Sequence, residues 1–329
     1  MATSNAAPPH LPPMLAGGTG APRDRNGWMF EPKFDGQRIV ATVHRGRVTL
    51  TNRRGSDATP TFPELAGLSG ADALGGRSAV LDGEVVATDE RGGPNFQRLQ
   101  RRMHVADPPP RLLADVPVVY AVFDVLWLDG ESLVERPQSA RRQVLDSLAL
   151  RGTAWQTAPV LDAPPGELLQ ACRDAGLEGF MAKRLDAPYL PGRRSPAWSK
   201  VKCIRRREFV VGGWAAGSGS RRSSIGSLAL GYFAVPDVDD RLVYVGQAGS
   251  GLTEDLLGQL RGLFTATGRP TSPFAGPVPR GLSFVEPLLV VEVAFTEVTE
   301  SGTLRQPSIK GVRPDLRAAG VTADEELRR

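Results

Sequence analysis

The stretch Glu31-Pro32-Lys33-Phe34-Asp35-Gly36-Gln37-Arg38 places a lysine in a tight connection. A proline before the lysine and a glycine three residues after it predict a turn rather than a helix interior. A lysine amine attacks only after losing its proton, so with an ordinary pKa of about 10.4 it needs a site that desolvates it or crowds it with cations. Asp35 and Arg38 bring both charge signs close to Lys33. By itself the string fits a solvated surface turn equally well, because short motifs recur by chance.

Five further strings follow in order: Asn52-Arg53-Arg54-Gly55, Leu81-Asp82-Gly83-Glu84, Ala121-Val122-Phe123-Asp124, Glu178-Gly179-Phe180-Met181-Ala182-Lys183 and Trp198-Ser199-Lys200-Val201-Lys202. With the first string, they resemble the successive motifs of the covalent nucleotidyltransferases. The chain is most similar to ATP-dependent DNA ligases of the small bacterial type, meaning the ligase domain of the bacterial end-joining ligase and its stand-alone relatives. The resemblance extends from about Pro13 to Asp315. Six ordered motifs at compatible spacing are far more specific than any one of them.

Length and composition set the class of protein. The chain has 329 residues, which predicts two domains with a sizeable core. Hydrophobic residues make up 41% and charged residues 23%, as in soluble globular proteins. No apolar run approaches the roughly 18 residues of a membrane span. The first 20 residues lack the basic start and apolar core of a secretory signal. We therefore expect a cytoplasmic, nucleoid-associated protein with a disordered tail at residues 1–12.

Cysteine and histidine usage excludes several kinds of site. Cys172 and Cys203 have no metal-ligand spacing, so we expect buried, unreactive thiols in a reducing compartment. The chain holds only three histidines, His10, His44 and His104. This scarcity argues against a histidine metal centre and against a Ser-His-Asp hydrolase.

Positive charge is concentrated rather than large. The net charge is only +4, but the pI is about 9.3. The clusters are Arg98 with Arg101 and Arg102, Arg193 with Arg194, Lys200 through Arg207, and Arg221 with Arg222. Clustered arginine is typical of proteins that hold a phosphate backbone, although a solvated surface would look the same. A two-domain enzyme would have to grip DNA with its own arginines, in a salt-sensitive way.

The sequence pattern of residues 27–205 predicts a mixed α/β domain. The segment Arg38 to Asn52 alternates apolar and polar residues around Gly46, which predicts a hairpin. Apolar runs predict two strands and amphipathic segments predict two helices: Val80 to Thr88 and Val116 to Leu128 for the strands, Pro137 to Leu150 and Glu167 to Ala175 for the helices.

After Arg207 the pattern changes to short strands separated by Gly- and Ser-rich turns, including Gly217 to Ser227. The predicted strands are Glu208 to Trp214, Leu228 to Val235, Leu242 to Gly246 and Val285 to Phe295, with one helix at Thr253 to Phe264. Such strands predict a small β-barrel, and the resemblance implies an OB-fold. The predicted fold class is α+β, with a nucleotidyltransferase (adenylation) domain at residues 13–206 and an OB-fold domain at 207–329.

The resemblance implies how the first transfer works. Lys33 takes AMP from ATP as a lysyl–AMP adduct, passes it to the 5′-phosphate at a nick, and the 3′-hydroxyl then displaces it. Glu31 contacts the adenine, and Phe123 stacks on it. Arg38 and Arg53 match positions that touch the ribose and the 5′-phosphate, where a planar guanidinium can make two parallel bonds. Without the resemblance, a lone Phe in such an apolar strand is expected to be core packing.

The resemblance also assigns a metal site and the phosphate cations. Glu84 and Glu178 would hold Mg²⁺ or Mn²⁺, with phosphates and waters as the other ligands. Lys183, Lys200 and Lys202 supply ammonium charge, the last two at the α-phosphate. Lys200 and Lys202 share a face if they lie on a strand. Taken alone, each acid would be an ordinary residue at a strand end.

The stretch Thr303 to Leu316 resembles the last ligase motif and the segment before it. The candidate residues of this motif are Lys310, Arg313 and Asp315. The family continues Arg-x-Asp with a lysine, whereas this chain has Leu316 followed by Arg317. Because the motif orients the pyrophosphate leaving group, this departure predicts slower self-adenylation but normal sealing by an already charged enzyme. Either Arg317 or Lys310 could take over the role.

The leading hypothesis is therefore an ATP-dependent DNA ligase that seals nicked duplex DNA in repair or end joining, acting as a monomer. An RNA ligase or a capping-type guanylyltransferase shares the Lys-x-Asp-Gly logic, but Leu81 to Glu84 and Ser308 to Gly311 favour a DNA ligase. A non-catalytic nucleic-acid-binding relative is a third hypothesis, supported only by Leu316. A Ku-type end-binding partner fits the resemblance, although nothing in the sequence demands it.

Overall fold

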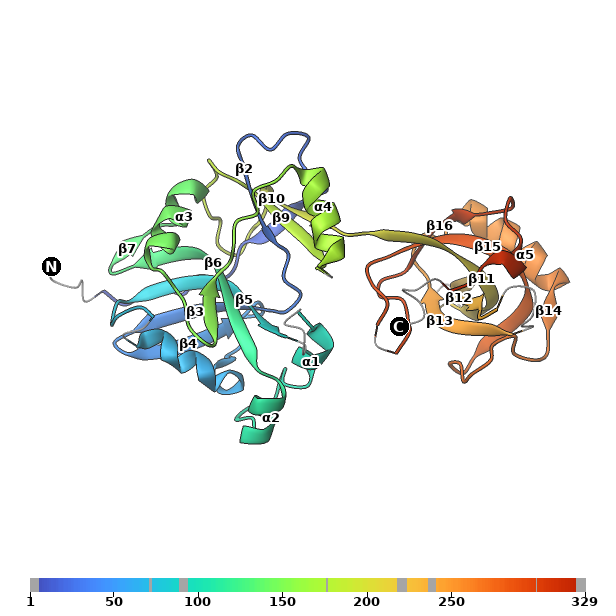
Figure 1. Ribbon diagram of the computed structural model, residues 1–329, viewed down its shortest axis with the longest axis horizontal. Coiled ribbons are helices and arrows are strands. Elements are labelled where there is room, and N and C mark those ends of the chain that lie inside the picture. Colours follow the sequence, from blue (N-terminus) through green and yellow to red (C-terminus); the bar gives the residue numbers. More distant parts are fainter. Residues whose placement is uncertain are drawn as a thin grey trace. The chain divides into compact units, whose positions relative to one another are not determined.

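The computed structural model describes residues 6–70, 73–88, 94–175, 177–217, 224–235, 241–299 and 301–323 (Figure 1). The chain divides into two compact units, Met1–Cys203 and Ile204–Arg329. The predicted turn at Gly217 to Ser227 and the pair Arg221 and Arg222 fall largely or wholly outside the described residues. No helix in the described ranges is long and apolar enough to cross a membrane.

The first unit combines strands with short helices. Its strands are β1 (Leu15–Thr19), β2 (Trp28–Pro32), β3 (Gln37–His44), β4 (Arg47–Asn52), β5 (Ala79–Ala87), β6 (Val118–Leu128), β7 (Glu131–Ser132), β8 (Trp155–Thr157), β9 (Gly179–Arg184) and β10 (Arg194–Lys202). Its helices are α1 (Phe96–Gln100), α2 (Pro110–Asp115), α3 (Gln138–Ser147) and α4 (Pro165–Asp174), with 3-10 turns at Thr59–Thr61 and Pro63–Ser69.

The elements predicted for this unit are confirmed. The hairpin consists of β3 and β4, which are joined by Arg45 and Gly46, both with positive φ (48° and 76°). Two consecutive positive φ values are typical of the tight turns that match strand twist. The two predicted strands are β5 and β6, and the two predicted helices are α3 and α4. Boundaries differ by up to three residues, as is usual where helix ends fray.

Two sheets pack face to face in the first unit. One has the strand order β1-β10-β9-β2, and the other has the order β4-β3-β5-β6-β7 with β8 beside β6. Trp198 of the first sheet belongs to one buried cluster with Val40, Val80 and Phe123 of the second. Because side chains alternate between the faces of a strand, every second residue on these strands points into the space between the sheets.

The outer faces of the two sheets have their own cores. Phe30 and Phe180 pack with Cys172 of α4 and with Cys203. Both cysteines are buried, as predicted, and burial together with the neighbouring Cys203 raises the pKa of the Cys172 thiol to about 11. On the outside of the second sheet, the 3-10 turn Pro63–Ser69, α1 and α3 cover the strands with apolar side chains. This layering fixes both inner faces rigidly.

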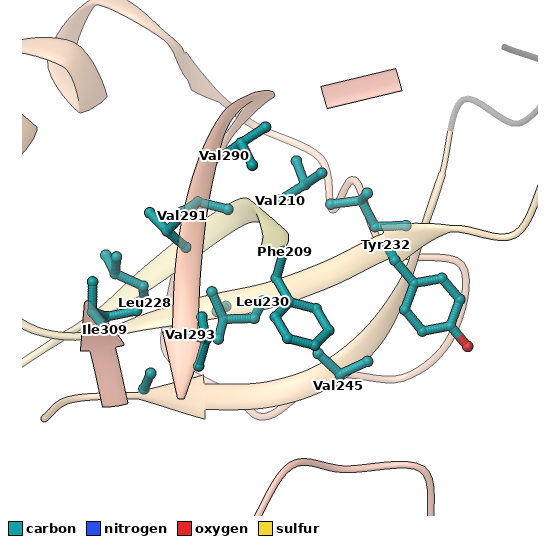
Figure 2. Packing of buried hydrophobic residues seen from close by; sticks show 14 of the residues in the cluster. Phe209, Val210, Leu228, Leu230, Tyr232, Val245, Val290, Val291, Val293 and Ile309 are labelled. Atoms are coloured by element: carbon teal, nitrogen blue, oxygen red, sulfur yellow. The ribbon is translucent and has the colours of Figure 1, made fainter. Parts of the chain in front are cut away.

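The second unit is a curled antiparallel sheet with one helix. Its elements are β11 (Arg205–Ala216), β12 (Ile225–Phe233), β13 (Leu242–Ala248), α5 (Glu254–Ala266), β14 (Gly268–Arg269), β15 (Leu282–Phe295), β16 (Ser308–Val312) and a 3-10 turn at Ala318–Gly320. The predicted strands and the predicted helix are confirmed. Figure 2 shows the interior that they enclose, with Phe209, Leu230, Val245 and Val293 converging from four strands.

The sheet of the second unit is strongly curled. Its order is β13-β12-β11-β15-β14, with β16 also paired to β15. A bridge joins Ser250, just after β13, to Ser308 at the start of β16, and the Ile309 amide donates to the Ser250 carbonyl at 2.9 Å. This isolated bridge brings the segment after β13 next to the start of β16, so the sheet curls in the way that a small β-barrel requires.

Candidate active site

The candidate nucleophile follows directly after β2. The Lys33 amide donates to the Gly179 carbonyl at 2.9 Å, and Gly179 is paired with Lys202 of β10. The row from Lys33 through Gly179 to Lys202 thus crosses three neighbouring strands. One carboxylate closes this row, because Glu178 accepts from the Lys33 ammonium and also lies 3.0 Å from the Lys202 Nζ. The structure therefore brings Lys33, Glu178 and Lys202 together.

Gly179 is required by the geometry of this row. Its φ is +142°, and a Cβ atom would lie 2.0 Å from the carbonyl oxygen of Val201. Only glycine allows β9 and β10 to approach so closely where β9 begins. Glu178 and Gly179 therefore act together: Gly179 allows β9 and β10 to approach closely, and Glu178 contacts both Lys33 and Lys202.

Cations dominate this end of the space between the sheets. Burial lowers the pKa of Lys200, and so do the positive charges of Lys33, Arg194, Arg53 and Lys202. The pKa of Glu178 is lowered in turn, because the ammonium groups bound to it outweigh the opposing effect of burial. Such a group of positive charges around one acid is suited to a polyanion such as a nucleotide triphosphate.

Arg38 faces this space from the opposite sheet. Its guanidinium makes two bonds to Asp82, Nε to Oδ1 at 2.6 Å and Nη2 to Oδ2 at 2.7 Å. The Tyr189 hydroxyl donates to the same carboxylate at 2.6 Å, and Asp82 is completely buried. Arg38 is thereby held in one orientation. No pattern in the sequence indicated Tyr189, which lies 107 residues from Asp82.

Glu84 lies directly opposite Arg38 in the β3–β5 pairing. Burial raises the pKa of its carboxyl to about 7, and the positive charges of Arg38 and Lys33 oppose this shift. Lys33 therefore interacts with one acid from each sheet: it forms an ion pair with Glu178, and its charge interacts with the Glu84 carboxylate. Within the described residues, no group of three or more His, Cys, Asp or Glu side chains could hold a metal by itself.

Phe123 lies in the buried cluster between the sheets, edge-to-face with Trp198 at a centroid distance of 6.0 Å. The Lys183 Nζ lies 4.3 Å from the Phe123 ring centroid, and the Arg38 guanidinium carbon lies 4.5 Å from it. A ring in contact with two cations carries a cation–π interaction with each. Phe123 therefore both packs in the core and borders the site.

Glu31 is buried together with two cations. Its Oε2 lies 2.6 Å from the Lys183 Nζ, and its Oε1 lies 3.0 Å from the Arg142 Nη1. Burial raises the pKa of the Glu31 carboxyl, although Lys183 and Arg142 oppose the shift. The charge of Lys183 is thus bound to an acid and not presented to solvent. The sequence did not indicate Arg142, because a pairing across 111 residues leaves no local pattern.

A cleft of ≈ 640 Å³ opens beside these groups on the second sheet. Arg38 and Glu84 form part of its wall, together with the exposed Arg53 and with Arg54 and His104. The candidate residues Arg38, Arg53 and Glu84 therefore share one open cleft.

Within the cluster of Arg98, Arg101 and Arg102, Arg102 does not belong to a charged surface, contrary to the phosphate-binding interpretation of its charge. Arg102 is completely buried, and it donates to both carboxylate oxygens of Glu64 at 2.6 and 2.9 Å. It also donates to the carbonyls of Thr61 and Val116. Its role is to hold the 3-10 turns against α1, because a buried guanidinium needs this many acceptors.

The remaining candidates belong to the second unit. Arg313 lies 2.5 Å from the Glu208 carboxylate and makes two bonds to Asp315, which raise its pKa. Lys310 is exposed on β16, and Leu316 is 37% exposed. The position where the family has a lysine thus carries an apolar side chain at the surface.

Comparison with known proteins decides the family. Residues 13–202 match the family model of the ATP dependent DNA ligase domain. This chain belongs to the ATP-dependent DNA ligase family. A second model, the ATP dependent DNA ligase C terminal region, matches residues 221–316 of this ligase. The predicted family and the predicted fold class, a nucleotidyltransferase domain followed by an OB-fold domain, are confirmed.

Several relatives of this ligase are longer proteins, which match this chain over only part of their own length. The multifunctional non-homologous end joining protein LigD of Mycolicibacterium smegmatis is 40% identical over 319 residues, which cover 94% of this chain and 39% of that protein. The LigD protein of Pseudomonas aeruginosa is 35% identical and covers 91% of this chain and 35% of its own length. A DNA ligase of Methanoculleus marisnigri is 34% identical, with 87% and 51% covered. The chain therefore spans about one third to one half of the length of these relatives.

Solved structures agree with the family. The ligase domain from M. tuberculosis LigD is 36% identical, covers 95% of this chain and 98% of its own, and has a TM-score of 0.55. A mycobacterial DNA ligase D complexed with ATP and MES has the same identity and a TM-score of 0.54. A Lig E DNA ligase at 20% identity and a TM-score of 0.61 shows the fold alone.

Proposed function

We propose that this ATP-dependent DNA ligase seals nicks in duplex DNA through a lysyl–AMP adduct on Lys33. The observation that carries the proposal is the arrangement around Lys33, where Lys200 and Lys202 gather positive charge beside Glu178. The Lys33 Nζ attacks the α-phosphorus of ATP, an N–P bond forms, and the bond to pyrophosphate breaks. An oxygen of the 5′-phosphate at the nick then attacks the AMP phosphorus, and the N–P bond to Lys33 breaks. Finally the 3′-hydroxyl oxygen attacks the 5′-phosphate, a phosphodiester bond forms, and AMP leaves.

The chain's own residues divide this work by position. Lys200, Lys202 and Arg53 neutralise charge that develops on the phosphates. Arg38, fixed by Asp82, meets the ribose from the opposite sheet. Because the Lys33 Nζ is bound to the Glu178 carboxylate, Glu178 must change partners before Lys33 can attack.

Glu84 and Glu178 fit a divalent cation. Both acids act on Lys33 from opposite sheets, and carboxylate oxygens are the ligands that Mg²⁺ and Mn²⁺ prefer. With only two protein carboxylates, phosphate oxygens and waters would complete the coordination, as is usual for Mg²⁺ at nucleotide sites. When bound, the cation would supply charge neutralisation at the phosphates.

The domain boundaries and the binding partners complete the proposal. Residues 13–206 form the adenylation domain and residues 207–329 the OB-fold domain. This boundary lies three residues after the division between the two units, and the segments matched by the two family models support a division in this region. Lys310, Arg313 and Asp315 act on the pyrophosphate in the first step. The enzyme is a monomer at the nucleoid.

The test is the adduct itself. Purified protein incubated with α-labelled ATP and Mg²⁺ should become labelled, and the label should map to the tryptic peptide Asn26–Arg38, uncut at Lys33. Lys33→Ala should abolish the label, and so should Lys33→Arg, because a guanidinium stays protonated. GTP should label poorly, and EDTA should stop the reaction. Label retained by Lys33→Ala would end the assignment, and a chain that takes no label would be a non-catalytic relative.

We further propose a role in end joining together with a Ku-type end-binding protein. The support is the 40% identity to a non-homologous end joining protein over 94% of this chain. A bacterial Ku protein should stimulate joining of linear DNA by this ligase without changing the rate of adduct formation. Equal stimulation of an unrelated ligase of similar size would contradict a specific partnership.

A further inference from the structure

Two neighbouring arginines of α3 bind acids on the two facing sheets. Arg141 donates to both oxygens of Asp124 on β6, at 2.8 and 2.9 Å, and both side chains are completely buried. Arg142 binds Glu31 on β2. Asp124 is adjacent to Phe123, and Glu31 is two residues before Lys33. One helix therefore contacts both sheets at the end that holds the nucleotide candidates.

Arg142 is fixed at three points. Its Nη1 lies 3.0 Å from Glu31 Oε1, its Nη2 donates to the Ala158 carbonyl at 2.8 Å, and its Nε donates to Asp146 at 2.9 Å. The Arg142 side chain is 11% exposed, whereas the Asp146 side chain is 53% exposed. The inner contacts of Arg142 therefore lie in a desolvated region, where charged hydrogen bonds are strong, and only the outer contact faces water.

We infer that Arg142 is a positioning residue that holds the Glu31 carboxylate in place to recognise the amino group at the 6-position of the nucleotide base. The inference rests on the proposed function, in which Glu31 contacts adenine. Lys183 holds the other oxygen of the same carboxylate at 2.6 Å. With both oxygens anchored, the carboxylate is restricted to one orientation, and each oxygen keeps a lone pair for a further donor.

The chemistry of this acid explains a preference for adenine. An ionised carboxylate accepts a hydrogen bond from the amino group of adenine and repels the oxygen that hypoxanthine carries at the same position. Burial already raises the pKa of Glu31, Lys183 and Arg142 lower it, and the negative charge of Asp124 raises it. Removing Arg142 therefore moves Glu31 towards its protonated form, which can donate to an oxygen. The structure thus links Arg142 to discrimination between ATP and inosine triphosphate.

The experiment compares rates of adduct formation with ATP and inosine triphosphate in the full-length protein. Arg142→Met should lower the preference for ATP by roughly tenfold, equivalent to about 1.4 kcal/mol, mainly through a higher KM for ATP. Arg142→Lys keeps a charge near Glu31 and should recover part of the preference. The matched control is Asp146→Asn, which removes only the outer contact and should stay within about twofold of wild type.

Two results overturn the inference. The first is that Arg142→Met keeps the wild-type preference for ATP over inosine triphosphate. The second is that Arg142→Met slows adduct formation equally with both nucleotides and also lowers the melting temperature, which is expected of a residue that only stabilises the fold. If Arg142→Met fails to fold, Arg142→Lys carries the test, and an unchanged preference there overturns the inference as well. A wild-type protein that forms no adduct refutes the proposed function, and the Arg142 assignment with it. An active wild type with an unchanged Arg142→Met refutes only the latter.

Discussion

Replacing Arg38 with methionine tests how much the buried pair with Asp82, which joins the neighbouring strands β3 and β5, stabilises the first unit. Asp82 has no exposed side-chain surface and accepts three hydrogen bonds, two from Arg38 and one from the Tyr189 hydroxyl. Arg38→Met leaves the Asp82 charge with a single neutral donor. The methionine fills part of the vacated space, so the loss is chiefly electrostatic.

The expected cost follows from this burial. Breaking a buried ion pair by removing one partner costs about 3–5 kcal/mol, because an uncompensated charge remains inside. The Arg38 side chain is 19% exposed, so water can reach the vacated position and favours the lower end of that range. We therefore expect the free energy of unfolding of the first unit to fall by about 3 kcal/mol.

A matched exposed pair provides the control. Arg25 and Asp162 also join distant segments, but their side chains are 51% and 83% exposed, so Arg25→Met should cost less than about 1 kcal/mol. Urea unfolding followed by tryptophan fluorescence reports the transition, since Trp198 has its ring centroid 5.4 Å from the Arg38 guanidinium carbon. Equal losses in the two variants, or a loss below about 1 kcal/mol in Arg38→Met, would refute the electrostatic reasoning.

Three further predictions test other parts of the molecule. Gly179→Ala should destabilise by at least about 3 kcal/mol because its Cβ would meet the Val201 carbonyl at positive φ, whereas Gly166→Ala, with open space around it, should be neutral or stabilising in thermal unfolding. The pKa of Glu84 is about 7 in the folded state and 4.5 in the unfolded state. In the presence of EDTA, its contribution to stability is therefore complete below pH 4.5 and is lost as the pH rises through 7. Glu84→Gln should remove this part of the pH dependence of stability in urea titrations. Leu316→Lys should speed adduct formation roughly tenfold, leaving sealing of a pre-adenylylated nick unchanged, and an unaltered rate would mean that Arg317 or Lys310 already fills the role.

The sequence predicted the layers of the fold because its patterns are local. Alternation in β3 and β4, the apolar run of β5, the turn at Gly46 and the amphipathic α3 each depend on residues close together in the chain. The ordered motifs also predicted that Lys33 and Glu178 serve one site, and the structure brings these two side chains into contact. Here a family pattern supplied what periodicity alone does not, namely which distant strands meet.

The partners of the site residues were not predictable in the same way. Arg142 belongs to a helix whose pattern indicates only one apolar face, yet its guanidinium reaches a carboxylate on another sheet. Arg102 is part of a basic cluster in the sequence, but its side chain is fully buried and is bound to Glu64 and to two backbone carbonyls. Charge in a sequence gives no information about burial, and burial decides whether an arginine holds the fold or meets a ligand.

The ion pairs of the site differ in how readily they can exchange partners. The pairs of Asp82 with Arg38 and of Glu31 with Lys183 are anchored by carboxylates with 0% and 2% exposure, so breaking either leaves a buried charge. Glu178 is 15% exposed and is shared between two lysines, so it can release one while keeping the other. A nucleotide entering between the sheets would therefore rearrange the contacts of Glu178 before those of Glu31 or Asp82. Glu178, which must release Lys33, is thus the acid whose surroundings make release least costly. Glu31, which contacts the base, and Asp82, which orients Arg38 towards the ribose, remain fixed.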